Sequence, residues 1–362
     1  MSRRLPLTAY LNRVSSTVPP NDVHQAFVEF AGGLLKGDRA APVFGRLVQR
    51  SQIDHRWSVL APAGGEHSDV VDAGGVYRRG AFPSTADRMR LYERFAADLA
   101  AEAVAGLELG DRAREVTHVI AVSCTGLSAP GIDLQLVERC GLDLSVERTV
   151  VGFMGCYAAI NALKLARHIV RSEPEARVLV VSVELCTLHL QETTNLEQVL
   201  SFLVFGDGCA AALVSSEPEG LSLDRFHAAL LPEAAEQITW SVGDQGFDMF
   251  LSGQVPASVG TALRNGRDKI LDGVAIEDID LWAVHPGGRS VLDAVETSLA
   301  LPPGALSESR EVLRRYGNMS SATILFVLQA LMQRARPGER GCAMAFGPGL
   351  TAETLLFTAT GA

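Results

Sequence analysis

Three side chains in this sequence are of types that together support thiolate chemistry. Cys156 stands in GCYAAINAL, His285 in AVHPGG and Asn318 in GNMSSATIL. At the start of a helix the dipole lowers the pKa of a thiol, and a neighbouring imidazole stabilises the thiolate. The imidazole and the amide can then donate hydrogen bonds to an oxygen that becomes negative during a reaction. These residues predict a nucleophilic cysteine, provided that the fold brings the three together.

Packing is the alternative role for Cys156, because free cysteine behaves as a small apolar residue. No two of the six cysteines are closer than sixteen residues, so CxxC metal or redox motifs are absent. A disulfide framework is not expected in a chain of this length without a secretion signal. We therefore expect free thiols, of which one or two are chemically special: Cys124, Cys140, Cys156, Cys186, Cys209 and Cys342.

An internal repeat favours the nucleophile. AVSCTG at 121–126 resembles AVHPGG at 283–288, and FGDGCAAALV at 205–214 resembles FGPGLTAETLL at 346–356. Cys156 follows Ser123 by 33 residues, and Asn318 follows His285 by the same number. This periodicity predicts two halves of matching construction, 1–218 with the cysteine and 219–362 with the histidine and asparagine, joined near 216–222. We expect the ligand site where the halves meet.

Alternating strands and helices predict an α/β fold with helices on both faces of the sheets. Residues 20–115 are expected to be mostly helical, from apolar spacings of three and four, and a further helix is expected over 156–171. The first half carries an insertion, ETTNLEQVLSFLV at 192–204, which we expect to wall a pocket. Strands are expected at 117–123, 149–153, 176–185, 209–216, 281–285, 342–346 and 353–360.

Composition narrows the class of protein. The net charge of −10 argues against a nucleic-acid-binding surface, although a local basic pocket for a phosphorylated small molecule remains compatible with it. Hydrophobic residues make up 47% of the 362 residues, which is typical of a globular chain. No apolar run approaches the ~20 residues that a membrane helix needs. The first twenty residues do not have the pattern of a signal peptide, so the cytoplasm is the expected location.

Five ordered motifs carry a resemblance to a known family. GFMGCYAAINALKLA, FGDGCAA, AVHPGG, RYGNMSSATILFVL and AFGPGLTAE together resemble the type III polyketide synthases, the chalcone synthase-like family. The resemblance runs from about residue 20 to the C-terminus. It implies the thiolase-like fold, a duplicated five-layered αβαβα arrangement, and a homodimer. It also implies a Cys-His-Asn triad and no metal or redox cofactor, with acyl-CoA and malonyl-CoA as substrates.

The resemblance assigns a role to each member of the triad. Cys156 would take the starter acyl group from its CoA thioester and hold the growing chain. His285 would support the thiolate. His285 and Asn318 would then stabilise the enolate formed when malonyl-CoA loses CO2, and the oxyanion of the condensation. Because decarboxylation generates the carbanion without a strong base, such a site needs hydrogen-bond donors rather than a carboxylate.

Further positions match the family's gatekeeper and CoA-binding residues. Phe205 matches a gatekeeper phenylalanine between the CoA tunnel and the cavity, with a core aromatic as the alternative role. Met249 stands where the second gatekeeper phenylalanine is expected, and Phe247 or Phe250 would replace it if the local register shifted. Arg46 and Arg50, four apart on one helix face, stand at two of the basic CoA-binding positions, whereas the third holds Val43. A solvated basic face is the alternative there.

Cavity-lining positions bear on the substrate. The set Thr125, Ala129 and Cys186 is similar to that of bacterial members with a long acyl-binding tunnel, and a small residue at Ala129 would remove a wall. A methylene-lined channel gains ~0.8 kcal/mol for each buried CH2. We therefore expect a medium- or long-chain acyl-CoA starter and an alkylpyrone or alkylresorcinol product. His189 would narrow the cavity or bind the polyketide, or else be a satisfied pocket histidine.

Other functions remain open from the sequence. Cys124 or Cys186 could supply a second cavity thiol, as in tetrahydroxynaphthalene synthases that use malonyl-CoA alone. A ketoacyl-ACP synthase III would share the fold and triad, but it would usually lack the HPGG context. A catalytically dead homologue is disfavoured because Cys156, His285 and Asn318 are all present. The GxGxxA pattern of GDGCAA at 206–211 precedes a strand rather than a helix, which excludes the dinucleotide-binding fingerprint.

Overall fold

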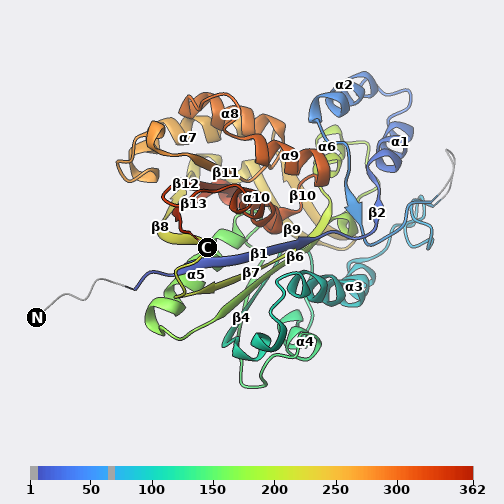
Figure 1. Cartoon of the computed structure of the whole chain (residues 1–362). Coiled ribbons are helices and arrows are strands. Elements are labelled where there is room, and N and C mark those ends of the chain that lie inside the picture. The colour runs from blue at the N-terminus through green and yellow to red at the C-terminus, as the bar shows by residue number, and fades with distance from the viewer. Residues whose placement is uncertain (1–6, 64–69, 362) are drawn as a thin grey trace, which may run out of the picture.

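The computed structural model describes residues 7–63 and 70–361, and its strands alternate with helices along the chain (Figure 1). The strands are β1 (Tyr10–Thr17), β2 (Asn21–Asp22), β3 (Trp57–Ser58), β4 (His118–Ser123), β5 (Glu147–Gly152), β6 (Val178–Leu185), β7 (Asp207–Ser215), β8 (Leu221–Leu230), β9 (Ile238–Gly243), β10 (Gly246–Leu251), β11 (Leu281–Val284), β12 (Arg340–Gly347) and β13 (Thr351–Ala359). The α-helices are α1 (His24–Leu34), α2 (Ala41–Ser51), α3 (Thr85–Ala105), α4 (Ile132–Arg139), α5 (Ala158–Ser172), α6 (Leu196–Val204), α7 (Val255–Ile270), α8 (Arg289–Leu299), α9 (Ser307–Tyr316) and α10 (Thr323–Met332).

One mixed sheet of nine strands displays the predicted repeat. Its order is β11-β12-β13-β8-β1-β7-β6-β4-β5. The parallel pair β4-β6 in the first half corresponds to the parallel pair β11-β12 in the second, and the antiparallel pairs β6-β7 and β7-β1 correspond to β12-β13 and β13-β8. The two halves meet where β1 pairs with β8. Among the described strands, β5 at the outer edge of the first half has no counterpart.

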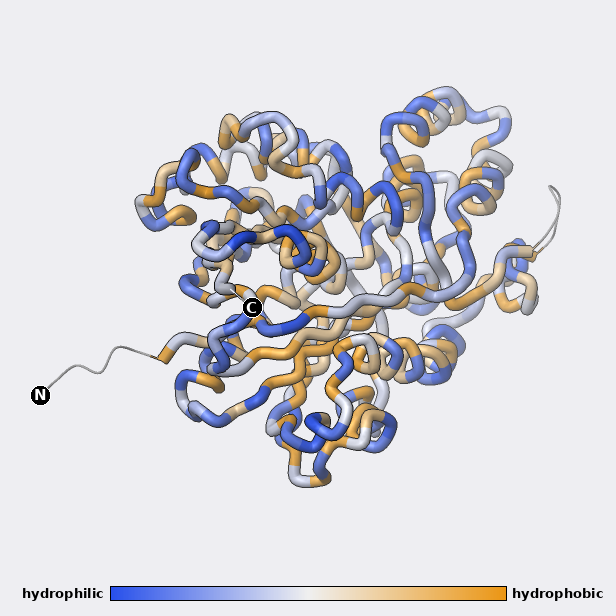
Figure 2. Tube along the Cα trace, in the orientation of Figure 1, coloured by the Kyte–Doolittle hydropathy of each residue, from blue (hydrophilic) through white to orange (hydrophobic). Residues whose placement is uncertain are grey.

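Strand β6 shows why these segments read as continuous apolar runs. Every residue of β6 is buried, because helices cover both of its faces. Val178 and Val180 pack into the cluster that contains α5, whereas Leu179 and Val181 point the other way, into the cluster that contains α3. Figure 2 shows the same distribution as hydrophobic colour along the central strands.

The helices form three layers around the two halves of the sheet. Residues of α5 and α10 lie together in the central core cluster. Helices α3 and α4 cover the outer face of the first half, and α7 and α8 the outer face of the second, at the bottom and top of Figure 1. The sequence of layers is therefore α3/α4, first-half sheet, α5/α10, second-half sheet, α7/α8. This confirms the five-layered thiolase-like fold.

Several elements differ from the sequence-based expectation. Residues 20–115 contain α1, α2 and α3, but much of the stretch from 52 to 84 is irregular, and the strands β1, β8, β9 and β10 were not expected. Strand β1 was not predicted from the sequence because polar residues interrupt its apolar pattern. In the fold these are satisfied: the Asn12 amide donates to the carbonyls of Glu217 and Glu219, and Ser16 Oγ donates to Gln329 Oε1.

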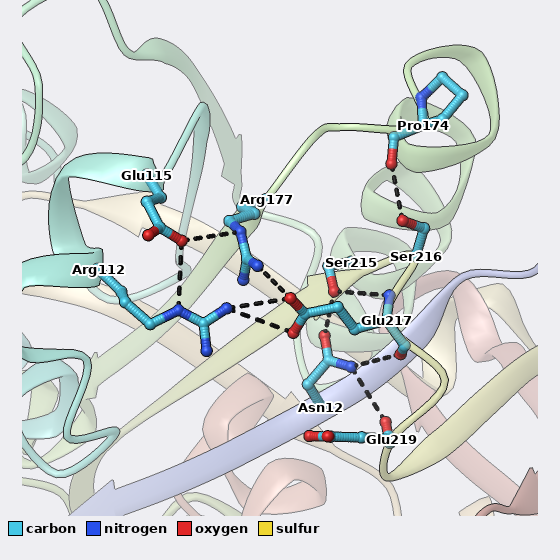
Figure 3. A network of polar contacts seen from close by, with 9 residues as sticks. All are labelled: Asn12, Arg112, Glu115, Pro174, Arg177, Ser215, Ser216, Glu217 and Glu219. Atoms are coloured by element: carbon cyan, nitrogen blue, oxygen red, sulfur yellow. Dashed lines mark hydrogen bonds and ion pairs between the residues drawn. The ribbon is translucent and has the colours of Figure 1, made fainter.

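The connection between the halves, 216–220, is held by a polar network (Figure 3). Arg112 Nη2 lies 3.1 Å from Glu217 Oε1, and Arg177 pairs with the same carboxylate. Ser215 Oγ donates to Asn12 Oδ1 at 2.8 Å. The network joins β1, the end of β7 and the start of β6, so it fixes the point at which the chain passes from one half to the other. In the described parts of the chain, no helix is long and apolar enough to cross a membrane.

Candidate active site

Cys156 lies in a tight turn between β5 and α5. Gly155 has φ +78°, and a Cβ at this glycine would lie 2.2 Å from Pro348 Cδ, so only glycine fits. On the other side, the Gly155 N–H donates to Cys124 Sγ at 3.0 Å. Helix α5 begins at Ala158. The sulfur is therefore presented just before the N-terminus of a central helix, as the repeat predicted.

His285 and Asn318 occupy corresponding places in the second half. His285 follows the last residue of β11, and its N–H donates to the Met344 carbonyl at 2.8 Å. Asn318 lies before α10, and its Oδ1 accepts a hydrogen bond from the Ser320 N–H at 2.9 Å. This contact fixes the amide so that Nδ2 is the remaining donor; it lies 3.3 Å from the Gly287 carbonyl.

Three neighbouring cavities lie at or near these residues and share lining residues with one another. The mouth cavity, about 1650 Å³ including solvent at its opening, is lined by Cys156, His285 and Asn318 together with residues of α2, α6, β10 and α8. The inner chamber, about 430 Å³, includes Cys156, Thr125 and Cys186. The side cavity, about 610 Å³ when the open solvent around it is included, is mostly apolar and also contacts Cys186. The fold thus brings the three predicted side chains into one cavity, and the insertion at 192–204 walls it through α6.

Burial keeps the thiol and the imidazole neutral in this structure. Burial raises the pKa of Cys156 to about 12, only partly offset by a hydrogen bond to Ser320 Oγ at 3.8 Å. Burial lowers the pKa of His285 to about 3. Both His285 ring nitrogens are buried without a hydrogen-bond partner among the described residues.

The two gatekeeper candidates lie where the mouth cavity meets the inner chamber, because both Phe205 and Met249 line both spaces. Phe205 directly follows α6, and Met249 lies on β10 opposite Trp240 of β9. The alternatives for the second position lie elsewhere. Phe250 is 41% exposed, and Phe247 stacks on His189.

Thr125 and Cys186 line the inner chamber as expected, together with Cys124. Burial raises the pKa of the Cys124 and Cys186 thiols well above the ordinary value, so both are neutral. Thr125 Oγ1 donates to Glu184 Oε2 at 2.8 Å and accepts from the Leu185 N–H at 2.9 Å. Its hydroxyl is therefore committed to the protein.

Ala129 lies outside the inner chamber of its own protomer, so its part in a cavity wall stays a prediction. In this segment of the chain, Thr125 is the last residue that lines the inner chamber. Ala129 lies on the exposed loop that leads to α4. Gly126 packs against the ring of Tyr92, where a Cβ would lie only 2.1 Å from Tyr92 Cγ, and the chain then turns to the surface. Ala129 is not among the residues that line the chamber of its own protomer.

His189 is a satisfied core residue, and its assignment to the cavity wall is corrected. Nε2 lies 2.7 Å from the Thr125 carbonyl, and Nδ1 accepts from the Phe247 N–H at 3.0 Å. The ring stacks on Phe247 with centroids 4.2 Å apart. Burial lowers its pKa to about 3. Both ring nitrogens of the neutral imidazole are therefore used, and none is left for a polyketide.

The basic residues on α2 differ in position. Arg50 lines the mouth cavity, whereas Arg46 is exposed and is not among the lining residues. A third arginine, Arg289 at the start of α8, also lines the mouth, and its Nη1 donates to the Arg50 carbonyl at 3.3 Å. Sequence reasoning missed Arg289, although it directly follows the HPGG motif.

Glu184 and Ser320 were also missed. Glu184 is fully buried on β6, where its carboxylate accepts from the Cys124 N–H and from the hydroxyl of Ser321. Burial raises its pKa. An acidic residue within the apolar run VLVVSVEL was the available signal.

Within the described residues, no group of three or more His, Cys, Asp or Glu side chains could hold a metal ion.

Comparison with known proteins identifies the family. The N-terminal domain of chalcone and stilbene synthases matches residues 21–218, and the C-terminal domain of the same family matches residues 223–360. The chain belongs to the chalcone and stilbene synthase family. These matches favour a type III polyketide synthase over a ketoacyl-ACP synthase III.

Individual relatives agree with this assignment. The chain is 35% identical over 329 residues to the alpha-pyrone synthesis polyketide synthase-like Pks18 of Mycobacterium tuberculosis, covering 86% of this chain and 81% of that protein. It is 31% identical to bisdemethoxycurcumin synthase of Oryza sativa subsp. japonica, covering 99% and 94%. The crystal structure of 1,3,6,8-tetrahydroxynaphthalene synthase from Streptomyces coelicolor aligns with a TM-score of 0.87 at 29% identity, covering 98% of this chain and all of that one. This type III polyketide synthase is therefore a condensing acyltransferase.

Proposed function

We propose that this type III polyketide synthase loads a medium- or long-chain acyl group from acyl-CoA onto Cys156 and extends it with malonyl-CoA. In this proposal His285 and Asn318 stabilise the enolate left by decarboxylation and the oxyanion of the condensation. Both His285 ring nitrogens lack a hydrogen-bond partner among the described residues, and Asn318 has a fixed amide with Nδ2 as donor. One N–H of Asn318 Nδ2 donates to the Gly287 carbonyl at 3.3 Å, which leaves its second N–H for a developing oxyanion.

The side cavity is the observation that carries the choice of starter. It is lined mainly by apolar side chains, among them Phe27, Leu60 and Leu190, and it shares Cys186, Phe202 and Phe205 with the inner chamber. An acyl tail attached to Cys156 could extend past Cys186 into this space, where each buried CH2 contributes about 0.8 kcal/mol. A relative named for alpha-pyrone synthesis favours an alkylpyrone over an alkylresorcinol product.

Use of malonyl-CoA alone is the second candidate, since a tetrahydroxynaphthalene synthase is among the structural relatives. A second reactive thiol would have to be Cys124 or Cys186. Cys124 Sγ accepts from the Gly155 N–H, and burial raises the pKa of both thiols. Because burial raises the pKa of Cys156 in the same way, these shifts do not separate the two candidates, and the starter panel described below decides between them.

We also propose a homodimer, which is typical of this family. Strand β5 is an edge strand, and exposed apolar residues gather on it and on the neighbouring loops: Leu127, Leu144, Val150 and Phe153. An uncovered apolar edge favours pairing with another chain. A molar mass measured by light scattering would test this proposal, and a monomer at micromolar concentration would contradict it.

A panel of acyl-CoA starters with malonyl-CoA tests the proposed reaction. Hexanoyl-, dodecanoyl- and palmitoyl-CoA are compared with malonyl-CoA alone, and products are identified by mass spectrometry. We expect pyrones primed by the longer chains and an acyl adduct on Cys156. Cys156→Ala should abolish the adduct, because the sulfur is the acyl carrier. Products formed only from malonyl-CoA, or an adduct that persists in Cys156→Ala, would contradict the proposal.

A further inference from the structure

A buried arginine that lines the side cavity contacts the chain segments of the gatekeeper Phe205 and of the catalytic Asn318. Arg56 is 2% exposed and precedes the short strand β3. Its Nη1 donates to the carbonyls of Phe202 at 2.8 Å and Phe205 at 2.6 Å, the two residues that flank the end of α6. Its Nε donates to His24 Nδ1 at 3.0 Å. One planar guanidinium thus ties α1 to the end of α6.

The segment held by Arg56 is joined directly to Asn318. The Asn318 N–H donates to the Val204 carbonyl at 2.7 Å, and the Gly206 N–H donates to the Asn318 carbonyl at 3.0 Å. Phe205 and Asn318 therefore form a parallel bridge between the halves of the chain. Any shift in the backbone of Phe205 is passed to Asn318.

Arg56 also packs against the other side of this bridge. Gly317 has φ +69°, and a Cβ there would lie 2.9 Å from Arg56 Cγ. At Gly206 a Cβ would lie 3.5 Å from Arg56 Cβ and 2.9 Å from the Tyr316 carbonyl. The stem of Arg56 fills the space that these two glycines leave open, so the side chain supports both strands of the bridge.

A purely apolar side chain could fill this volume at lower desolvation cost. Burial lowers the pKa of Arg56 to about 9, and Nη2 has no hydrogen-bond partner among the described residues. The guanidinium lies 4.7 Å from the centroid of the Phe27 ring, which compensates only in part. What the arginine adds over a hydrophobic residue is the pair of hydrogen bonds from Nη1 to the end of α6.

We propose that Arg56 is a positioning residue of the condensing site, holding Phe205 and Asn318 as one unit. The proposal rests on the proposed function. Lysine cannot replace it, because a single ammonium group lacks the planar fork that reaches His24 and two carbonyls together. Loss of the fork should displace the Asn318 amide, which acts on the enolate, while leaving the Cys156 turn in place.

Arg88 provides a matched control. It is fully buried, its Nη1 donates to the carbonyls of Leu188 and Leu190, it lies 5.1 Å from the Tyr77 ring centroid, and its Nη2 is likewise unpartnered among the described residues. It contacts neither Phe205 nor Asn318 in any described hydrogen bond. Arg56→Lys and Arg88→Lys should therefore lower the thermal midpoint similarly and differ in catalysis.

The experiment measures CO2 release from malonyl-CoA, alkylation of Cys156 by iodoacetamide and thermal unfolding in the full-length protein. In Arg56→Lys we expect kcat for decarboxylation to fall about tenfold or more, as a small misplacement of a catalytic group does, with KM and alkylation within about twofold of wild type. Arg88→Lys should decarboxylate within about twofold of wild type.

Wild-type decarboxylation in Arg56→Lys, or an equal loss in both variants, would overturn the proposal. If Arg56→Lys does not fold, Arg56→Met decides, since it keeps an apolar stem in the same space and removes the hydrogen bonds to the carbonyls of Phe202 and Phe205: a reduced kcat at unchanged alkylation supports the role, and an unchanged kcat overturns it. A wild-type protein that releases no CO2 would instead contradict the proposed function. The two failures are therefore distinguishable.

Discussion

Two histidines with the same burial show what decides function at the scale of a residue. His189 and His285 are both fully buried, and burial lowers the pKa of each to about 3. His189 has a hydrogen-bond partner at each ring nitrogen, whereas His285 has none among the described residues. Because an unpaired buried donor is costly, it is expected where a substrate completes the hydrogen bonds. The sequence displays both residues as lone histidines, so only contacts separate them.

Two arginines at the mouth cavity, Arg50 and Arg289, are predicted to bind the phosphate groups of CoA. Arg50 has no carboxylate partner among the described residues, and Arg289 shares Asp293 with Arg310, which lies closer to it at 2.7 Å. Arg289→Ala should raise KM for malonyl-CoA about tenfold at similar kcat, because a charge-assisted contact to phosphate is lost. KM for the N-acetylcysteamine thioester of malonate, which lacks phosphate, should not change.

Arg94 is the control for this measurement, because it is exposed on α3, away from the mouth cavity. Arg94→Ala should leave both KM values unchanged. Equal KM increases for the two thioesters in Arg289→Ala would contradict phosphate binding and indicate a general distortion of the mouth.

At the scale of elements, the segment after β6 divides the inner chamber from the side cavity. Cys186 opens a short 3-10 helix, Cys186–His189, and lines both spaces. Cys186→Phe should block the passage and lower the use of dodecanoyl-CoA relative to hexanoyl-CoA about tenfold, since each methylene excluded from the side cavity loses about 0.8 kcal/mol. Starter competition read by mass spectrometry measures the ratio.

Cys186→Ser keeps the size of the side chain and should retain the use of long starters. An unchanged ratio in Cys186→Phe would mean that the tail follows another route.

The element scale also shows which predictions the sequence supports. Strands such as β6 and β12 were predictable because helices cover both faces and the segments are continuously apolar. Strand β1 was not, since its polar side chains are satisfied by distant partners such as Glu217 and Gln329. The Phe205–Asn318 bridge and the contact of Arg56 with Phe205 join segments that are far apart in the chain. Local sequence patterns do not predict such contacts.

At the scale of the whole molecule, the internal repeat explains why a few short motifs were enough to predict that Cys156 and Asn318 line one cavity. Pairing of β1 with β8 sets the two halves edge to edge, so Cys156 and Asn318 approach one cavity from the starts of α5 and α10. The equal spacing of 33 residues in the two halves therefore reflected equivalent positions of Cys156 and Asn318 in the fold. The cavity's shape was not predictable, because it depends on the insertion carrying α6 and on the register of β10, where the halves differ.

The fold as a whole should lose stability on mild acidification. Burial lowers the pKa of His24 to about 4 and of His189 and His285 to about 3, all from 6.5. Below pH 6.5 these three histidines are protonated in the unfolded chain but remain neutral in the native state. The free energy of unfolding therefore falls as the pH falls. Burial of Asp207 acts oppositely: its pKa rises to about 6, and its native state retains a proton that the unfolded state loses above 3.8.

Three histidines outweigh the two carboxyl groups whose pKa burial raises, Asp207 and Glu184, so the free energy of unfolding still falls as the pH falls toward 5. The thermal midpoint should therefore drop between pH 7 and pH 5 and change much less between pH 7 and pH 8, where the histidines of the unfolded chain are already mostly neutral. His189→Gln should be less stable at pH 7 but should show a shallower slope, since one of the three protons is removed from the balance. A midpoint that rises or stays constant from pH 7 to pH 5 would mean that these histidines are accessible to protons in the native state.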